Sequence, residues 1–383
     1  MPPPKPRVLI ATTVEWESLS EIPYIFNKGG CVVDILCPPN AWVLKNSHVH
    51  HWINSKNSDD FLSLLLQTIE SDHYDWIVPL DDILLKMIRE NPLPEGVKAH
   101  VIPLCKHENI EILGSKSGLE KICEKYGFNR PKTAYSDDIT SLADIKEQFA
   151  FPVLLKLDHS WGGIGIVLSK DFDHLQSVIE SMPPTGYLVQ EYISGKDIGV
   201  ESLFRCGQLL TIQSGHVIEY TGTQFEPTIR REYFYDQELT RVVQQIGADI
   251  GINGFASMQF IYDKSKQQYY LLEVDVRPQA WCRYGDFTGN DFSEGVKRFT
   301  GQVNNVPTNL VKENGKPVEV VLFHKSLIAI IRKRSPWRLL KFIFNTRNWK
   351  YIPFYDRKYL KYVMIDVKDR ILDGIRKKYT ARN

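Results

Sequence analysis

Residues 151–170, FPVLLKLDHSWGGIGIVLSK, place a lysine inside an apolar run and follow it with a cluster of glycines. A buried ammonium group such as that of Lys156 is costly unless it is paired or has a function. Gly162, Gly163 and Gly165 allow backbone N–H groups to approach an anion closely. Together, the buried lysine and the glycine-rich turn predict a phosphate-binding site.

The bulk composition is that of an ordinary globular protein, with 43% hydrophobic and 24% charged residues. A chain of 383 residues predicts two or three domains. The six cysteines are scattered without a C-x-x-C pair, which favours reduced thiols over a disulfide framework or a zinc site. The first residues lack the apolar core of a signal peptide, and no run approaches the ~20 apolar residues of a membrane span. We therefore expect a cytoplasmic protein.

The N-terminal third alternates short apolar runs with helical patterns. The runs predict strands at 7–13, 31–39, 74–80 and 99–105, and the helical patterns lie at 59–71 and 81–91. Strands separated by helices predict right-handed crossovers and a parallel sheet. Because no G-x-G-x-x-G follows the first strand, we expect a Rossmann-like sheet that does not bind a dinucleotide. Its cleft-facing edge would lie around Thr12–Glu15 and Leu80–Asp82.

The middle of the chain mixes helices with paired strands. Helices are predicted from Ser115 to Gly127 and at 141–150, 172–182 and 236–251. Two strands surround a Ser-Gly turn at 186–204, and residues 255–279 predict a hairpin joined by DKSKQQ.

Four features follow one another in this region: Lys116 at a helix start, Lys156 with its glycine loop, the segment QEYISGKD, and LLEVDVRP at the end of a hairpin. This ordered set resembles the ATP-grasp superfamily, in particular its carboxylate–amine ligases, over roughly residues 7–302. The resemblance implies an α/β fold in which a Rossmann-like domain precedes an ATP-grasp module and a basic, mainly helical tail. The expected domains are 1–113, 114–185 (small subdomain), 186–302 (large subdomain) and 303–383.

The resemblance also implies an ATP site built from these segments. Lys116 and Lys156 would contact phosphates, the glycine loop would close over them, and the 190–193 hinge would hold adenine. The residues implied for ATP are Lys116, Lys156, Gly162, Gly163, Gly165, Gln190, Glu191, Tyr192, Ile193 and, on the ribose, Asp197. Each has a simpler alternative, such as a strand-end lysine at 156 or a turn carboxylate at 197.

The end of the hairpin predicts a metal site. Glu273 and Asp275 are two residues apart on a strand, so they share a face, and two carboxylates on one face suit Mg²⁺, with Mn²⁺ as an alternative. Arg277 shares that face and can hold a phosphoryl group. Arg277 and Lys156 are therefore the candidate catalytic residues. The family's usual run is Glu-x-Asn-x-Arg with an earlier carboxylate. This chain has Asp275 in place of the asparagine and Gln259 in place of that carboxylate, which puts the metal stoichiometry in question.

The family's usual reaction phosphorylates a carboxylate with ATP, after which an amine displaces phosphate. The resemblance therefore implies a ligase for a small-molecule acid and amine. The alternatives are a kinase for a hydroxyl or carboxylate, and a nucleotide-binding homologue without turnover. Arg230, Arg231 and Arg283 are candidates for gripping a substrate acid, and each could equally be a surface arginine.

The C-terminal segment is strongly basic. Residues 325–383 carry 17 Lys and Arg against four acidic residues, and the rest of the chain is net acidic. Aromatic residues such as Trp337 and Phe344 lie among these cations. The pattern favours peripheral membrane contact, docking on the protein's own acidic surface, or self-association. We expect a homodimer and no nucleic-acid partner.

Overall fold

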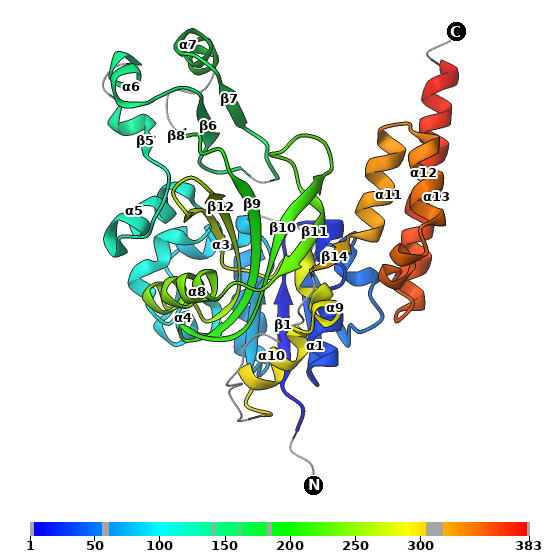
Figure 1. The fold of residues 1–383 in the computed structure, drawn as a ribbon. Helices are drawn as coiled ribbons and strands as arrows, with labels where there is room; N and C mark the ends of the chain where they lie inside the picture. The colour runs from blue at the N-terminus through cyan, green and yellow to red at the C-terminus, as the bar shows by residue number, and fades with distance from the viewer. Residues whose placement is uncertain are drawn as a thin grey trace. The chain divides into compact units, whose positions relative to one another are not determined.

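The computed structural model describes residues 4–55, 61–139, 142–160, 162–181, 186–303 and 317–380, the side chains of 142, 143 and 374–380 excepted. The chain forms two compact units (Figure 1). The first unit contains residues 1–81, 217–235 and 279–383, and the second contains residues 82–216 and 236–278. The four-domain division expected from the sequence stays a prediction, and its boundary at 185 lies outside the described residues.

A parallel sheet begins the first unit. Its strands, in the spatial order β3-β2-β1-β4, are β1 (Arg7–Ala11), β2 (Val32–Cys37), β3 (His51–Asn54) and β4 (Trp76–Pro79). Its connections include the short helix η1 (Glu17–Leu19), α1 (Ile22–Lys28), η2 (Trp42–Lys45) and α2 (Phe61–Ser71). Strands β1 and β2 are almost entirely buried, as expected for inner strands of a parallel sheet. The expected parallel sheet is therefore confirmed.

The rest of the first unit pairs two strands and adds helices. Strands β11 (Thr228–Phe234) and β14 (Val318–Val321) are antiparallel. The helices are η6 (Ala280–Tyr284), α9 (Gly285–Thr288), α10 (Phe292–Phe299), α11 (Phe323–Arg332), α12 (Pro336–Phe344), η7 (Thr346–Tyr351) and α13 (Arg357–Thr380). Tyr233, Trp281, Val320 and Phe342 belong to one buried cluster. Apolar burial therefore holds α12 against the strands.

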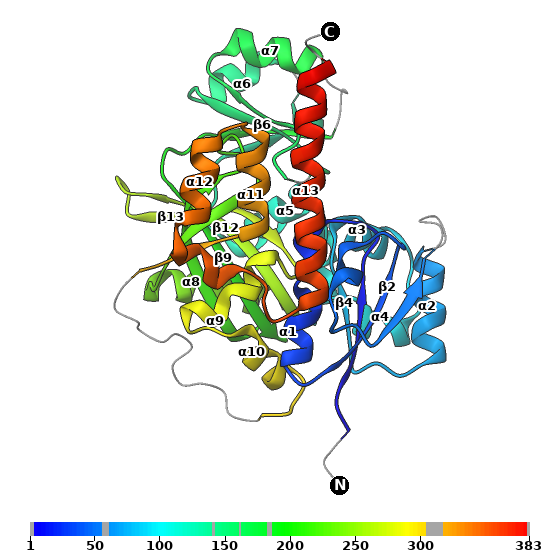
Figure 2. The ribbon, with the colours of Figure 1, turned by 90° about the vertical axis from the view of Figure 1, so that its right-hand side faces the viewer.

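The last helices dock on the start of the chain. In Figure 2, α11, α12 and α13 lie side by side in orange and red. His324 on α11 links them to η1, with Nδ1 2.8 Å from a Glu17 oxygen and Nε2 3.0 Å from an Asp366 oxygen on α13. The buried hydroxyl of Ser20 donates to Tyr359, also on α13. Part of the basic C-terminal segment is thus held by acidic residues of its own unit.

His324 predicts a pH dependence of stability. Burial acts to lower its pKa, but hydrogen bonds to Asp366 and Glu17 outweigh burial and raise the pKa to about 9. The unfolded value is about 6.5. Because its pKa is raised in the folded protein, His324 contributes about 3 kcal/mol to the free energy of unfolding. This contribution is complete below pH 6.5 and is lost as the pH rises through 9.

Urea unfolding at pH 6 and pH 9.5, compared between wild type and His324→Gln, measures this contribution. The wild type should lose about 3 kcal/mol more than His324→Gln over that range, because other groups cancel in the comparison. His73→Gln, a change at an exposed histidine of the same unit, is the matched control. Equal pH dependence of stability in wild type and His324→Gln would contradict this stabilising role of His324.

A small sheet occupies part of the second unit. Its antiparallel strands, in the order β5-β8-β6-β7, are β5 (Thr133–Tyr135), β6 (Val153–Leu157), β7 (Ile166–Ser169) and β8 (Tyr187–Glu191). The helical segments beside it are η5 (Ser136–Asp138), α6 (Leu142–Gln148) and α7 (Phe172–Glu180). Ile145, Val153, Leu175 and Val189 lie in one buried cluster, so one face of the sheet is covered by helices (Figure 1).

The second unit also contains larger antiparallel strands in the order β13-β12-β9-β10. Their bounds are β9 (Lys196–Arg205), β10 (Gln208–Tyr220, whose end passes into the first unit), β12 (Gly254–Asp263) and β13 (Gln268–Asp275). Its other helices are α3 (Asp82–Glu90), α4 (Glu95–Val101), η4 (His107–Ile112), α5 (Lys116–Tyr126) and α8 (Gln237–Ile250). Helix α8, in the predicted 236–251 segment, buries Leu239, Val243, Ile246 and Ile250, which recur every three or four residues.

One predicted strand is wrong. Residues 99–105 contain the end of α4, and a single bridge from Leu104 to Ile252 is the only strand-like pairing among them. The helix starts after Pro94 and buries Val97 and Val101, which are four residues apart. Apolar residues that looked like a short strand are therefore the core-facing side of a helix end.

Candidate functional site

Lys156 lies within β6, an inner strand of the small sheet. Its side chain is buried, at 8% exposure, and Nζ donates a 2.6 Å hydrogen bond to Oε1 of Gln190 on β8. Burial lowers the pKa of Lys156 to about 8, helped by the charge of Lys116, while Glu273 and Glu120 act in the opposite direction. The fold thus brings together Lys156 and Gln190, both expected to contact ATP, and the charge of Glu273 on β13 acts on the lysine.

Gln190 is oriented by a second layer of polar contacts. Its Nε2 donates to Oε1 of Glu120 on α5 at 3.3 Å and to Oγ1 of Thr133 at 3.1 Å. Glu120 also accepts from Nε of Arg130 at 2.6 Å, and burial raises the pKa of Glu120 despite that arginine. These contacts fix the amide so that its oxygen faces Lys156. Sequence patterns did not identify Glu120 or Arg130.

Helix α5 ties down the segment that follows β6. Ser115 caps the helix by accepting from the N–H of Gly118, and Lys116 is its first residue. The Lys116 ammonium donates to the carbonyl oxygens of Asp158 (3.1 Å) and Ser160 (2.8 Å). The Asp158 carboxylate accepts from both the N–H and the hydroxyl of Ser117, at 2.8 Å each. The two lysines expected at the phosphates therefore belong to one connected region.

The glycine loop has the backbone that its sequence predicts. Gly162, Gly163 and Gly165 have φ values of 62°, 81° and 74°, in the left-handed region that favours glycine. Gly165 also lies tightly against β6, because an added Cβ would come within 2.5 Å of Leu157. Ile164, between them, is exposed. The loop therefore presents backbone on a compact turn beside Lys156's strand.

Gly165→Ala should destabilise the protein by about 2–3 kcal/mol, because the left-handed φ and the clash with Leu157 add. The control is Gly186→Ala, where φ is +84° but a Cβ would meet nothing within 4 Å. That control should lose only about 1 kcal/mol, the cost of φ alone. Urea unfolding of both variants measures the difference, and equal losses would rule out the clash.

The predicted hinge follows β8. The N–H of Glu191 donates to the carbonyl of Lys132 at 2.8 Å, so that group is already used in the sheet. Tyr192 and Ile193 come after the strand ends, and the Ile193 side chain is buried. Asp197 is the second residue of β9. The roles expected for these residues and for Gln190 in binding adenine and ribose stay predictions.

The β12–β13 hairpin places the predicted metal ligands together. Gln259 is directly opposite Glu273, and Ser257 is opposite Asp275, with a bulge after Gln259. Directly opposite residues on antiparallel strands lie within side-chain contact distance. Across the described parts of the chain, no group of three or more His, Cys, Asp or Glu could hold a metal by itself. The site thus offers two carboxylates and one amide.

Arg277 lies just after β13 and is buried, at 6% exposure. Its guanidinium binds Asp82 at the start of α3 bidentately, at 2.8 and 2.7 Å, and reaches Asp275 at 3.2 Å. Burial, together with the charges of Asp82 and Glu273, raises the pKa of Asp275, and Arg277 opposes that shift. Asp82 lies in the segment predicted to face the cleft, but no pattern in the sequence predicts its pairing with Arg277.

Strand register adds buried polar residues to the face of β13 that carries Asp275. Ser257 on β12 is opposite both Asp275 and Glu201, and Glu201 on β9 is opposite Gln213 on β10. Glu201 and Gln213 are buried. Neither residue is predictable from the sequence pattern, because a buried polar residue in a strand has the same local sequence signal as one at the surface.

The three candidate acid-binding arginines lie in the first unit. Each guanidinium contacts other side chains there, so their proposed role in gripping a substrate acid stays a prediction. The contacts are Glu219 and Glu319 for Arg230, Thr228 and the Trp281 ring for Arg231, and Asp286 with the Tyr24 and Tyr355 rings for Arg283.

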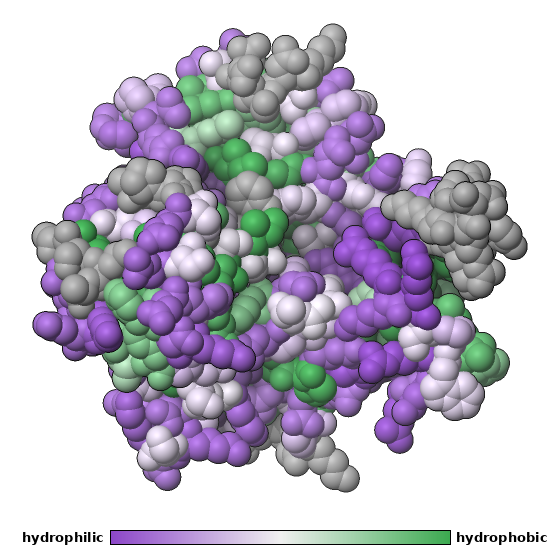
Figure 3. Space-filling model, turned by 90° about the horizontal axis from the view of Figure 1, so that it is seen from above, coloured by the Kyte–Doolittle hydropathy of each residue, from purple (hydrophilic) through white to green (hydrophobic). Residues whose placement is uncertain are grey.

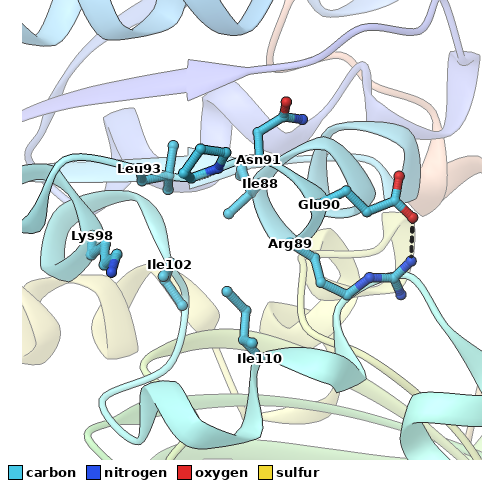
Figure 4. Close-up of a pocket in the computed structure, with 9 residues that line it drawn as sticks. Ile88, Arg89, Glu90, Asn91, Leu93, Lys98, Ile102 and Ile110 are labelled. Carbon is cyan, nitrogen blue, oxygen red and sulfur yellow. Dashed lines mark hydrogen bonds and ion pairs between the residues drawn. The ribbon is translucent and has the colours of Figure 1, made fainter.

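The second unit also has a surface pocket. It is lined by the end of α3 and neighbouring segments, and Figure 4 shows Arg89 paired with Glu90 at its rim, 2.8 Å apart. None of the predicted ATP-contacting residues lines it. We therefore place the candidate site at Lys156, Glu273 and Arg277.

Comparisons with known proteins identify this region. Residues 113–281 match the family model described as an ATP-grasp domain. A carbamoyl-phosphate synthase from Methanobrevibacter smithii is 24% identical over 222 residues, which cover 55% of this chain and 59% of that protein. The chain thus spans under two thirds of that relative.

Two solved structures share the fold. The L-amino acid ligase from Bacillus licheniformis has a TM-score of 0.57 at 18% identity, covering 77% of this chain and 74% of the ligase. The N5-carboxyaminoimidazole synthetase from Staphylococcus aureus, solved with ADP, has a TM-score of 0.63 at 17% identity and covers 86% of both chains. Residues 113–281 thus match an ATP-grasp domain model, and the chain shares its fold with these two structures.

Proposed function

We propose that this protein is an ATP-dependent ligase that activates a carboxylate as an acyl phosphate, joins it to an amine, and releases ADP and phosphate. The observation that carries the proposal is the presence of two buried cations, Lys156 and Arg277, in the region that matches the ATP-grasp model; the charge of Glu273 acts on Lys156, and Asp275 is ion-paired with Arg277. A lysine with its pKa lowered by burial gains most from a nearby anion, which is what a nucleotide phosphate would supply.

The residues present fit ATP with Mg²⁺. Lys156, Lys116 and the backbone of the glycine loop would hold the phosphates, and Glu273, Asp275 and the Gln259 amide oxygen would hold the ion. Mg²⁺ is commonly held by one or two carboxylates together with substrate phosphates, so the lack of a third carboxylate does not disqualify the site. The bound ion would neutralise charge on the transferred phosphoryl group.

The chain's own residues would act by positioning and by charge. Gln190 and Glu120 hold the Lys156 ammonium in place, so it can meet a phosphate without reorganising. Asp82 fixes the Arg277 guanidinium by accepting two hydrogen bonds, one from Nε and one from Nη2. The Nη2 atom of Arg277 donates a hydrogen bond to Asp275 as well as to Asp82. Asp275 therefore links the predicted ion ligands to the predicted phosphoryl-binding arginine.

The test is nucleotide turnover with Mg²⁺, pooled carboxylic acids and amino acids, and mass spectrometry of the products. ADP that forms only with both an acid and an amine, together with their condensation product, would establish a ligase. ADP with one acceptor and a phosphorylated product would establish a kinase instead. ATP binding is measured in the same samples, and absence of binding would overturn the proposed site. Lys156→Ala is the control with strongly lowered activity, and Lys121→Ala, at an exposed lysine of α5, is the matched control with normal activity.

A homodimer is a further part of this proposal. It is tested by light scattering of the full chain at several concentrations, and a mass that stays at 44.2 kDa would contradict it.

A further inference from the structure

Helix α12 has two apolar faces. Phe342 and Leu339 point into the buried cluster of the first unit. Trp337, Leu340 and Phe344 are spaced by three and four residues, so they form a second stripe on another side of the helix. Trp337 and Phe344 are each 75% exposed, and Leu340 is also exposed. An aromatic stripe of this kind on a helix surface marks an interaction site.

The stripe extends beyond the helix. The indole N–H of Trp349 in η7 donates to the carbonyl of Ile343 at 2.8 Å, which fixes that half-exposed ring at the end of α12. Phe354, in the following loop, is 67% exposed. Figure 3 shows green hydrophobic residues beside purple hydrophilic ones at its right-hand edge, where the C-terminal helices lie.

The charge around the stripe has one sign. Residues 332–350 contain seven Lys and Arg and no Asp or Glu. Arg338, Lys341 and Arg347 are exposed, and in the described part of the chain none of them forms an ion pair with a carboxylate. By contrast, the inner side of the C-terminal helices is compensated, because Glu17 and Asp366 hold His324. The cations beside the stripe are thus available to an external anion.

We propose that this outer face of α12, made of Trp337, Leu340, Lys341 and Phe344 with Arg338, Arg347 and Trp349 around it, docks on an anionic lipid surface. Tryptophan and phenylalanine favour the boundary between headgroups and acyl chains, and clustered Lys and Arg are attracted to anionic lipids. Among the residues that the structure describes, no helix is long and apolar enough to cross a bilayer, so the contact would be peripheral.

The positive charge of this outer face of α12 argues against a second copy of the chain as its binding partner. A two-fold dimer brings identical patches together, so it would place Arg338, Lys341 and Arg347 of one chain against the same three cations of the other. Like charges facing each other across an interface are destabilising. A lipid surface supplies the missing anions, which is why it is the favoured occupant.

The experiment is flotation of the full chain with vesicles of phosphatidylcholine containing 30% phosphatidylglycerol, compared with phosphatidylcholine alone. We expect binding to the anionic vesicles at least tenfold stronger, and weakened by raising the salt from about 0.1 to 0.5 M. Trp337→Ala/Phe344→Ala should reduce binding at least tenfold, and so should Arg338→Gln/Lys341→Gln/Arg347→Gln. Equal binding to neutral vesicles, no binding by the wild type, or binding unchanged by both variants would overturn the proposal.

Matched controls separate the surface from general effects. Trp52→Ala/Tyr235→Ala removes two exposed aromatic residues elsewhere in the first unit, and Lys98→Gln/Lys121→Gln/Lys170→Gln removes three charges from the second. Both should bind like the wild type. Thermal unfolding and ATP binding check that each variant is folded.

Two further readouts distinguish lipid from self-association. Trp337→Phe should bind normally but lose part of the quenching by lipids brominated in the acyl chain. Light scattering without lipid should give the same mass for wild type and Trp337→Ala/Phe344→Ala, whereas a dimer abolished by this variant would overturn the lipid assignment. The test does not depend on the proposed ligase activity.

Discussion

Lys156→Ala should lower kcat/KM for ATP by about 10²–10³-fold, a typical cost of removing one preorganised group that stabilises developing charge. The ammonium is buried and held by Gln190, so water cannot replace it in the right place without rearrangement. Steady-state kinetics with the acceptor found in the turnover screen measures the loss. Isothermal calorimetry reports ATP affinity separately.

The same lysine predicts a pH dependence of binding. With the pKa of Lys156 at about 8, the side chain of the free protein is mostly charged at pH 7 and mostly neutral at pH 9. ATP favours the charged form, so its binding should take up protons near pH 8, and affinity should fall by up to about tenfold per pH unit above 8. Calorimetry in two buffers of different ionisation enthalpy detects the proton uptake.

The controls for Lys156 are an exposed lysine and a conservative change. Lys121→Ala should leave kinetics within about twofold, since its exposed ion pair with Glu111 contributes little. Lys156→Arg keeps the charge but not the shape of the site, and should recover only part of the activity. If Lys156→Ala bound ATP as tightly as the wild type at all pH values, the phosphate-contacting role would be wrong.

Arg277→Ala should abolish detectable transfer and lower the free energy of unfolding by about 3–5 kcal/mol. Removing the guanidinium leaves Asp82 and Asp275 close to each other without a counter-charge, and breaking a buried pair from one side carries a cost of this size. Urea unfolding and product mass spectrometry measure the two effects. Arg277→Lys keeps the charge but loses the bidentate contact, so it should be more stable than Arg277→Ala yet remain slow.

Two variants separate stability from positioning. Arg89→Ala removes a partly exposed arginine of α3 paired with the exposed Glu90, and should cost about 1 kcal/mol without loss of transfer. Asp82→Asn keeps the shape behind Arg277 but removes the charge, and should lower kcat more than it changes KM for ATP. A stable, fully active Arg277→Ala protein would show that this arginine has no part in the reaction.

Local sequence signals predicted most of the second unit. Helix α5 begins after Ser115 and ends at Gly127, because a serine cap and a left-handed glycine determine its ends. The hairpin of β12 and β13 follows from two apolar runs that contain several aromatic residues and lie on either side of a polar turn. Where ends of elements are fixed by neighbouring residues, the sequence is enough.

Elements fixed by distant partners were not predictable in this way. Strand β3 was missed because it is a largely exposed edge strand. Asp82 and Glu120 read as ordinary helix residues, and only the folded chain shows that they hold Arg277 and Gln190. Their partners lie 195 and 70 residues away, beyond any periodic pattern.

The division of the chain into two units has a consequence for synthesis on the ribosome. The second unit is complete once residue 278 has emerged, whereas the first unit waits for its C-terminal helices after its parallel sheet has been made. Neither unit can be produced by cutting the chain at one point, because residues 217–235 of the first interrupt the second. A nascent or truncated chain that ends before α11 would therefore contain the whole ATP-grasp segment but leave Glu17 and Ser20 without His324 and Tyr359.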